Sequence, residues 1–231
     1  MKKYSLPCFN EPIKKLIGKY ESGKLTMIYG NAASGKTTSC LLASIACARN
    51  KGKIIFVDTE NGFDSERLKQ LYYGDLKEIL DNIFLIQPKT FEEQFETILK
   101  LKKLCENESI KLIIVDTIGS LYRKRLSDNP KGINKLMAVQ MANLVRIARD
   151  LNKVVLITNQ VSSKVDGTND IKMVGGKMME NLSKVIIELK KNDEKKYAKL
   201  VKYKYDEENK IHHNLDEKME FKIKSNGLIL A

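Results

Sequence analysis

The chain has 231 residues and a formal net charge of +12. This length allows one α/β domain with a substantial core and is too short for two domains of typical size. No apolar run approaches the ~20 residues of a membrane span, and the Met-Lys-Lys-Tyr-Ser start lacks the apolar segment of a secretory signal. We therefore expect an intracellular protein. Its four cysteines form no C-x-x-C pair, and no Cys/His cluster suggests zinc.

The positive charge is concentrated in one part of the chain. Residues 119–177 contain 11 Lys and Arg against 4 Asp and Glu, so this window carries +7 of the +12. An excess of this kind favours a polyanionic partner, and nucleic acid is the natural one. A solvated, lysine-rich surface is the alternative.

Hydrophobic periodicity and turn residues predict strands alternating with helices. In chain order we expect a lead-in helix ending at Gly18, a strand at 25–29, a helix at 35–50, a strand at 53–58, short helices at 65–73 and 75–80, a strand at 82–87, a helix at 91–107, a strand at 111–116, a helix at 132–151, a strand at 153–158, a flexible loop at 161–176, and β segments at 184–190, 197–205 and 219–223.

This alternation predicts an α/β fold with a doubly wound, mostly parallel sheet and a C-terminal antiparallel extension. We expect residues 1–231 to form a single domain, with residues 1–24 as the lead-in and residues 183–231 as the β extension. Ligands of such sheets bind beyond the carboxyl ends of the strands. The P-loop, Glu60, Asp116 and Gln160 each follow a predicted strand. We therefore expect them to meet at the carboxyl edge of the sheet.

A glycine-bounded loop follows the first predicted strand. Gly30, Gly35, Lys36 and Thr37 fill every fixed position of G-x-x-x-x-G-K-[ST], the phosphate-binding P-loop. Glycine lets the loop curl so that successive backbone N–H groups point at one anion. Lys36 is expected to reach the outer phosphates of ATP, and the Thr37 hydroxyl to hold Mg²⁺. The predicted ATP-binding residues are Gly30, Asn31, Ala32, Ala33, Ser34, Gly35, Lys36, Thr37 and Thr38.

A second motif ends the fourth predicted strand. Leu112-Ile113-Ile114-Val115-Asp116 has the Walker B form, in which four apolar residues deliver a carboxylate to the sheet edge. Alone, this pattern is weak evidence for a Walker B motif, because many buried strands end in aspartate. Its position some 80 residues after a P-loop makes the evidence strong. Asp116 is therefore predicted to bind Mg²⁺ together with Thr37, directly or through water.

Hydrolysis also needs a group that orients the attacking water. Glu60, just beyond the second strand, is the best-placed carboxylate; Asp58 is its rival but reads as a structural strand end. Gln160 could contact the γ-phosphate and pass its presence to the loop that follows, or be an ordinary polar strand terminus. Lys36, Glu60 and Gln160 are the predicted catalytic residues.

Basic residues lie after Asp116 and in or beside the 161–176 loop. Such side chains neutralise phosphates without reading bases. Tyr122 could stack on a base, although a single aromatic residue after an apolar run is more often part of the core. The predicted DNA-binding residues are Arg123, Lys124, Arg125, Lys164, Lys172 and Lys177.

Together these motifs resemble the ATPase core of the RecA/RadA recombinase family over residues 6–230. The resemblance implies a RecA-like fold, the hydrolytic carboxylate at Glu60, a nucleotide sensor at Gln160, and single-stranded DNA facing the segments after Asp116 and Gln160. The chain looks like a short archaeal paralog of RadA that lacks the helical N-terminal domain. The resemblance implies that it binds DNA, hydrolyses ATP weakly and assists recombinational repair. The matching segments are residues 30–37, 57–63, 66–68, 112–116, 158–161 and 175–176.

One departure concerns assembly, because RadA-type proteins polymerise through a Phe-x-x-Ala segment. Phe9-Asn10-Glu11-Pro12 ends in proline here, so filament formation by that route is not expected. The expected partners are single-stranded DNA bound without sequence preference, a RadA recombinase, a structure-specific nuclease and a second copy of the chain, with no membrane and a nucleoid location. A nucleotide-bound, non-enzymatic adaptor for a recombinase or nuclease and a KaiC-like signalling ATPase are the alternatives.

Overall fold

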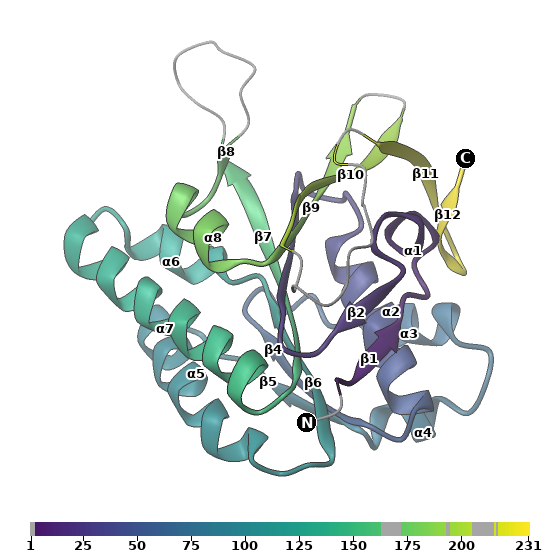
Figure 1. Cartoon of the computed structure of the whole chain (residues 1–231), viewed down its shortest axis with the longest axis horizontal. Coiled ribbons are helices and arrows are strands. Elements are labelled where there is room, and N and C mark those ends of the chain that lie inside the picture. The colour runs from purple at the N-terminus through teal and green to yellow at the C-terminus, as the bar shows by residue number, and fades with distance from the viewer. Residues whose placement is uncertain (1–2, 163–171, 193–194, 205–214, 216) are drawn as a thin grey trace.

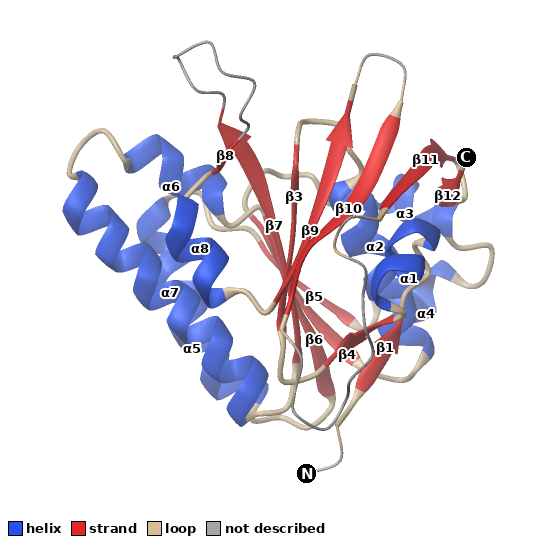
Figure 2. Ribbon diagram, turned by 45° about the horizontal axis from the view of Figure 1, so that its top comes forward, coloured by secondary structure: helices blue, strands red, loops and turns tan. Residues whose placement is uncertain are grey.

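The computed structural model describes residues 3–162, 172–192, 195–204, 215 and 217–231. In this part of the chain, a twisted mixed sheet separates two layers of helices (Figures 1 and 2). The strands are β1 (Ser5–Pro7), β2 (Lys19–Glu21), β3 (Leu25–Gly30), β4 (Lys53–Asp58), β5 (Ile83–Ile86), β6 (Ile110–Asp116), β7 (Val154–Ser162), β8 (Lys172–Met173), β9 (Val185–Lys191), β10 (Lys196–Tyr203), β11 (Lys218–Lys224) and β12 (Gly227–Leu230). The helices are α1 (Glu11–Ile17), α2 (Lys36–Arg49), α3 (Ser65–Leu71), α4 (Leu76–Leu80), α5 (Phe91–Cys105), α6 (Gly119–Arg125), α7 (Pro130–Asp150) and α8 (Gly176–Leu182).

The main sheet has the order β12-β11-β10-β9-β3-β7-β6-β4-β5, and β8 pairs with β7. Strands β5, β4, β6, β7, β3 and β9 run parallel, and β10, β11 and β12 continue the sheet antiparallel. The predicted mostly parallel sheet with an antiparallel C-terminal extension is therefore confirmed.

Strand register determines which residues reach the carboxyl edge of the sheet. Asp58 at the end of β4 lies opposite Asp116 at the end of β6. Gly30 at the end of β3 lies opposite Gln160 of β7 on one side and Leu189 of β9 on the other. The P-loop, the Walker B carboxylate and the amide of Gln160 thus belong to neighbouring strands.

Side-chain alternation divides the core into two layers. Phe56, Ile114 and Leu156 point to the layer covered by α1 to α4, whereas Val57 and Val115 point to the layer covered by α5 to α8. All five are fully buried. A strand buried on both faces needs apolar residues at every position, which explains the uninterrupted apolar run before Asp116.

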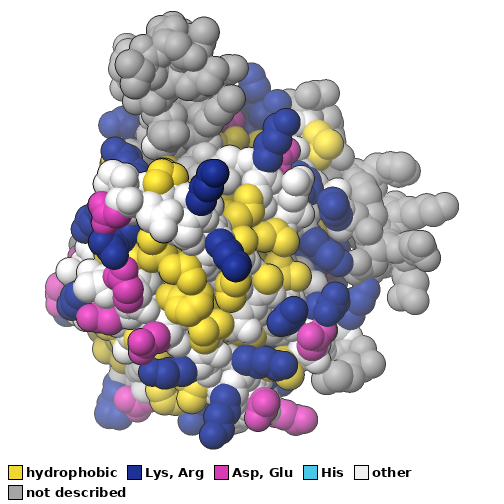
Figure 3. Space-filling model, turned by 90° about the vertical axis from the view of Figure 1, so that its left-hand side faces the viewer, with side chains coloured by type: hydrophobic (Ala, Val, Ile, Leu, Met, Phe, Trp, Pro, Cys, Tyr) yellow, Lys and Arg dark blue, Asp and Glu magenta, His cyan; other side chains and the backbone are white. Residues whose placement is uncertain are grey.

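The outer surface of the α5 and α7 layer keeps some apolar side chains in contact with solvent. Leu99 of α5 is 42% exposed and Val139 of α7 is 40% exposed. On this face, hydrophobic side chains gather at the centre among Lys and Arg side chains (Figure 3).

Several short elements were not predicted. Strands β1 and β2 have three residues each, and helices α6 and α8 have seven, which is too short to show a clear hydrophobic period. The basic segment after Asp116, for which no helix was predicted, forms the helix α6. Strand β7 does not end at Gln160, because it pairs with β8 through Val161 and Ser162. Of the expected flexible loop, residues 163–171 lie outside the described residues.

The cysteines belong to the core. All four are free and buried, and burial raises the pKa of Cys105 to about 11 and that of Cys47 to about 12. Such thiols behave as small hydrophobic residues. Within the described residues, no helix combines the length and apolar character needed to cross a bilayer.

Candidate nucleotide site at the carboxyl edge of the sheet

The P-loop joins β3 to α2 through backbone conformations that favour glycine. Gly35 has a φ of 99° immediately before α2 begins at Lys36, and this left-handed region is unfavourable for residues with a Cβ. A Cβ on Gly30 would lie 2.0 Å from the carbonyl oxygen of Leu189. The two glycines therefore allow a close strand contact and a sharp turn, and the turn leaves the first N–H groups of α2 facing the loop.

The interior of the loop suits an anion. The Lys36 ammonium donates to the carbonyl oxygens of Gly30 at 3.0 Å and Asn31 at 2.7 Å. Burial lowers the pKa of Lys36, while the negative charges of Asp116 and Glu60 oppose that shift. Among the described residues, the buried Ser34 hydroxyl has no hydrogen-bond partner, so it is available to an incoming oxygen. The predicted ATP-binding residues from Gly30 to Thr38 all lie in this loop and in the first turn of α2.

Asp116 is buried where β6 ends. Its carboxylate accepts a hydrogen bond from the Thr158 hydroxyl of β7. Burial raises the pKa of Asp116; hydrogen bonds from Thr158 and Thr37 oppose this shift, and the charges of Asp58 and Glu60 add to it. The contact with Thr37 places the Walker B carboxylate beside the hydroxyl of the P-loop threonine. Both groups are oxygen donors of the kind that Mg²⁺ prefers, so the residues fit the metal.

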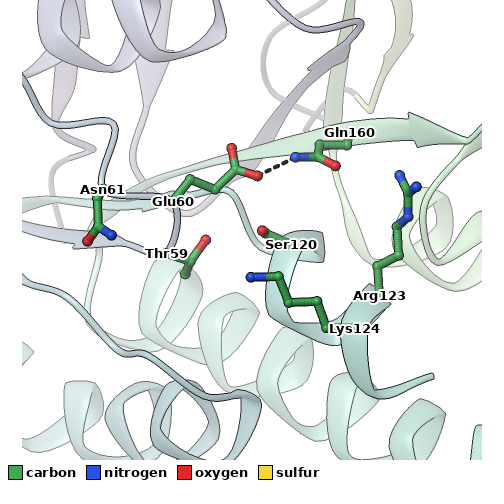
Figure 4. Close-up of a pocket in the computed structure, with 7 residues that line it drawn as sticks. All are labelled: Thr59, Glu60, Asn61, Ser120, Arg123, Lys124 and Gln160. Carbon is green, nitrogen blue, oxygen red and sulfur yellow. Dashed lines mark hydrogen bonds between the residues drawn. The ribbon is translucent and has the colours of Figure 1, made fainter. Parts of the chain in front are cut away.

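Glu60 and Gln160 face one another across the edge of the sheet (Figure 4). The Gln160 amide donates to one carboxylate oxygen of Glu60, and the Thr117 hydroxyl donates to the other at 3.1 Å. The loop that carries Glu60 also borders the P-loop, since a Cβ on Gly62 would lie 3.8 Å from the Thr37 hydroxyl. Lys36, Thr37, Glu60, Asp116 and Gln160 are therefore brought together.

Asp58 organises the loop of Glu60. Its carboxylate accepts hydrogen bonds from the backbone N–H groups of Glu60 at 3.2 Å, Gly62 at 3.0 Å and Phe63 at 3.1 Å, and from the Gln87 amide at 3.1 Å. With both of its oxygens used in this way, Asp58 has a structural role, as expected from its position at the end of the strand.

An open pocket of about 560 Å³ begins beside Glu60. Glu60 and Gln160 form part of its lining, and two of the predicted DNA-binding residues, Arg123 and Lys124, extend into it from α6 (Figure 4). The remaining lining residues are Thr59, Asn61 and Ser120. A polyanion that contacts Arg123 and Lys124 would thus lie directly next to the carboxylate of Glu60.

The other predicted DNA-binding residues lie elsewhere. Arg125 forms ion pairs with Glu92, at 2.9 Å, and with Asp128, so its charge is already compensated. Lys177 is exposed on α8, which packs against α7. For Lys172 the structure gives only the backbone, in β8, and Lys164 lies outside the described residues.

Sequence reasoning missed three threonines at this edge. Thr59, Thr117 and Thr158 are each at most 7% exposed, and threonine at a strand end is too common to stand out. Of the two alternatives for Tyr122, base stacking and the core, the structure supports the core, since Tyr122 is 3% exposed and its hydroxyl donates to Asn134. The segment Asn10–Pro12 begins α1, where Asn10 caps the helix and donates to Ser39 at 2.8 Å.

Comparison with known proteins gives one consistent result. The Rad51 family model matches residues 10–228. The chain belongs to the Rad51 family. The matched region includes the P-loop, Glu60, Asp116 and Gln160.

Individual members of the Rad51 family match along nearly their whole length. Proteins called DNA repair and recombination protein RadB are 38% identical in Methanococcus maripaludis, 37% in Methanocaldococcus jannaschii and 36% in Archaeoglobus fulgidus. Each alignment covers 91–92% of this chain and 94–96% of the relative. A structure described as the crystal structure of the RadB recombinase superposes with a TM-score of 0.80 at 28% identity, covering 96% of this chain and 98% of the other.

Proposed function

We propose that this Rad51-family chain binds ATP with Mg²⁺, hydrolyses it slowly, binds DNA without sequence preference, and assists homologous recombination and DNA repair. The single observation that supports this most strongly is the convergence of Lys36, Thr37, Glu60, Asp116 and Gln160 at one edge of the sheet. The relatives called DNA repair and recombination protein RadB support the cellular role. A RadA recombinase, a structure-specific nuclease and a second copy of the chain are the proposed protein partners.

Nucleotide binding would use groups that are already in place. The N–H groups of the P-loop and the Lys36 ammonium would bind the phosphates. Thr37 and Asp116 would hold Mg²⁺, which when bound neutralises charge on the phosphate oxygens. The buried Asp116 accepts a hydrogen bond from Thr158, so its carboxylate is held in place before any ligand arrives.

Hydrolysis would depend on Glu60, which would orient water and accept its hydrogen bond. Both carboxylate oxygens of Glu60 currently accept hydrogen bonds, one of them from Gln160. A γ-phosphate would compete with Glu60 for the Gln160 amide, which would release one oxygen of Glu60 for water. Because Gln160 lies in β7, which pairs with β8 through Val161 and Ser162, this exchange would also shift the β7–β8 pair.

DNA would bind along α6, where Arg123 and Lys124 point into the pocket beside Glu60. Backbone phosphates in that pocket would be held by charge alone, which gives no base preference. The shared pocket would make nucleotide turnover sensitive to DNA.

Turnover measured with and without single-stranded DNA tests this proposal. Glu60→Gln should retain nucleotide affinity and lower the rate of ATP hydrolysis by about 100-fold, because a neutral amide accepts the hydrogen bond of the attacking water more weakly than a carboxylate does. Glu96→Gln is the matched control, since Glu96 is exposed on α5 and pairs only with Lys100, at 3.5 Å, among the described residues. Equal rates for wild type and Glu60→Gln would remove Glu60 from its role. Nucleotide binding with no turnover in the wild type would instead identify an adaptor.

A further inference from the structure

We propose that Thr117 is a positioning residue for hydrolysis: its buried hydroxyl fixes the direction of the Glu60 carboxylate. This inference rests on the proposed function, since it assigns the group through which Glu60 acts. It concerns a residue next to the Walker B carboxylate that neither the P-loop pattern nor the Walker B pattern includes.

The backbone of Thr117 is held tightly in place. Its N–H donates to the Thr59 hydroxyl at 3.0 Å, and the same hydroxyl donates to the Thr117 carbonyl oxygen at 2.8 Å. Thr117 is 1% exposed and Thr59 is 7% exposed. These two bonds join the segment after β6 to the segment after β4, which is the segment that carries Glu60.

The hydroxyl groups of this edge are divided between the two carboxylates. A threonine hydroxyl can donate only one hydrogen bond. Thr158 donates to Asp116. The Thr117 hydroxyl lies 3.1 Å from an oxygen of Glu60 and 3.4 Å from an oxygen of Asp116, and its single proton goes to Glu60, the nearer acceptor, because Asp116 already has Thr158. The two hydroxyl oxygens lie 3.2 Å apart. Each carboxylate therefore has its own buried donor, and the pair of donors fixes the position of the water-orienting acid relative to the metal-binding acid.

The Glu60 side chain needs a buried hydrogen-bond donor because packing does not fix its orientation. That side chain is exposed, and an exposed glutamate loses considerable rotamer freedom when fixed in one orientation. The other donor, Gln160, is half-buried, and in the proposed function it leaves Glu60 for the γ-phosphate. Thr117 would then be the contact that remains when water is oriented.

Removal of the hydroxyl should therefore lower the rate without changing nucleotide binding. Thr117→Val keeps the shape of the side chain and should lower the single-turnover rate at saturating ATP about tenfold, since a misdirected catalytic group is costly. Its affinity for a non-hydrolysable ATP analogue should equal that of the wild type. Thr117→Ser should restore most of the rate, because serine keeps the donor. Thr26→Val, at a buried threonine near the start of β3, is the control for losing a buried hydroxyl.

A double-mutant cycle separates positioning from a general structural effect. If Thr117 acts through Glu60, Thr117→Val should have little further effect on the rate in a Glu60→Gln background. A tenfold loss in both backgrounds, or a wild-type rate in Thr117→Val, would overturn the inference. Equal rates for wild type and Glu60→Gln would instead count against the proposed function.

Discussion

The P-loop edge and the helix α6 lie side by side, yet they are built in different ways. Lys36, Asp116 and Thr158 are at most 9% exposed and come from central strands or from the helix that follows one of them. The three basic residues of α6, by contrast, are exposed. Sheet register and burial fix the side chains of the P-loop edge, whereas the basic side chains of α6 can change conformation at the surface.

This difference predicts how each region responds to substitution. A buried group that is aimed at a phosphate cannot be replaced by a neighbour, so its loss should be severe and insensitive to salt. Exposed cations share one polyanion, so the loss of one should be moderate and depend on ionic strength.

The largest effect is expected at Lys36. Lys36→Ala should weaken ATP binding by about 100-fold, or about 2.7 kcal/mol, because no other ammonium among the described residues lies inside the loop to meet the phosphates. Isothermal titration calorimetry measures this directly. The loss should be similar at low and at moderate salt.

A second buried lysine provides the control. Lys24, which directly precedes β3, is 3% exposed and interacts with Glu21 and Tyr203. Lys24→Met should reduce the free energy of unfolding while leaving ATP affinity unchanged. If both variants bind ATP as the wild type does, the buried region is not the phosphate site and the comparison fails.

A smaller effect is expected on α6. Reversing both charges that line the pocket, with Arg123→Glu and Lys124→Glu together, should weaken binding of single-stranded DNA about tenfold at moderate salt. The dependence of log affinity on log salt concentration should flatten by about 1.4, as expected when two phosphate contacts are lost. Fluorescence anisotropy across a salt series measures both quantities.

Arg125 distinguishes specific contacts from total charge. It pairs with Glu92 and Asp128, so Arg125→Glu should change DNA affinity less than Arg123→Glu does, although each variant alters the net charge by the same amount. Equal losses for the two single variants would mean that α6 acts only through its overall charge, and the assignment of Arg123 and Lys124 to the DNA path would be withdrawn.

The same contrast explains what the sequence could predict. Fixed spacing identifies the P-loop, and four apolar residues before Asp116 identify a buried strand that ends in a carboxylate. Because parallel strands share one carboxyl edge, the approach of Glu60 to Gln160 followed from the order of strands and helices. All of these features depend on local patterns or on topology.

Other features depend on contacts that no local pattern records. Helix α6 has seven residues and is too short to show a hydrophobic period, so no helix was predicted there. Strand β7 extends past Gln160 because it pairs with β8, which has only two residues. The hydrogen bond from Thr117 to Glu60 joins residues 57 positions apart, and threonine is ordinary at the end of a strand. The ion pairs of Arg125 likewise required the placement of α5.

The central claim is that one edge of the sheet holds the phosphate loop, the metal carboxylate and the water-orienting acid together around one nucleotide. A crystal structure with Mg²⁺ and a non-hydrolysable ATP analogue tests it most directly. We predict the triphosphate in the loop from Gly30 to Thr38, the metal between Thr37 and Asp116, and the terminal phosphate beside Glu60, with Thr117 still bonded to that carboxylate. A nucleotide bound elsewhere, or one whose terminal phosphate lies away from Glu60 and Asp116, would contradict the account.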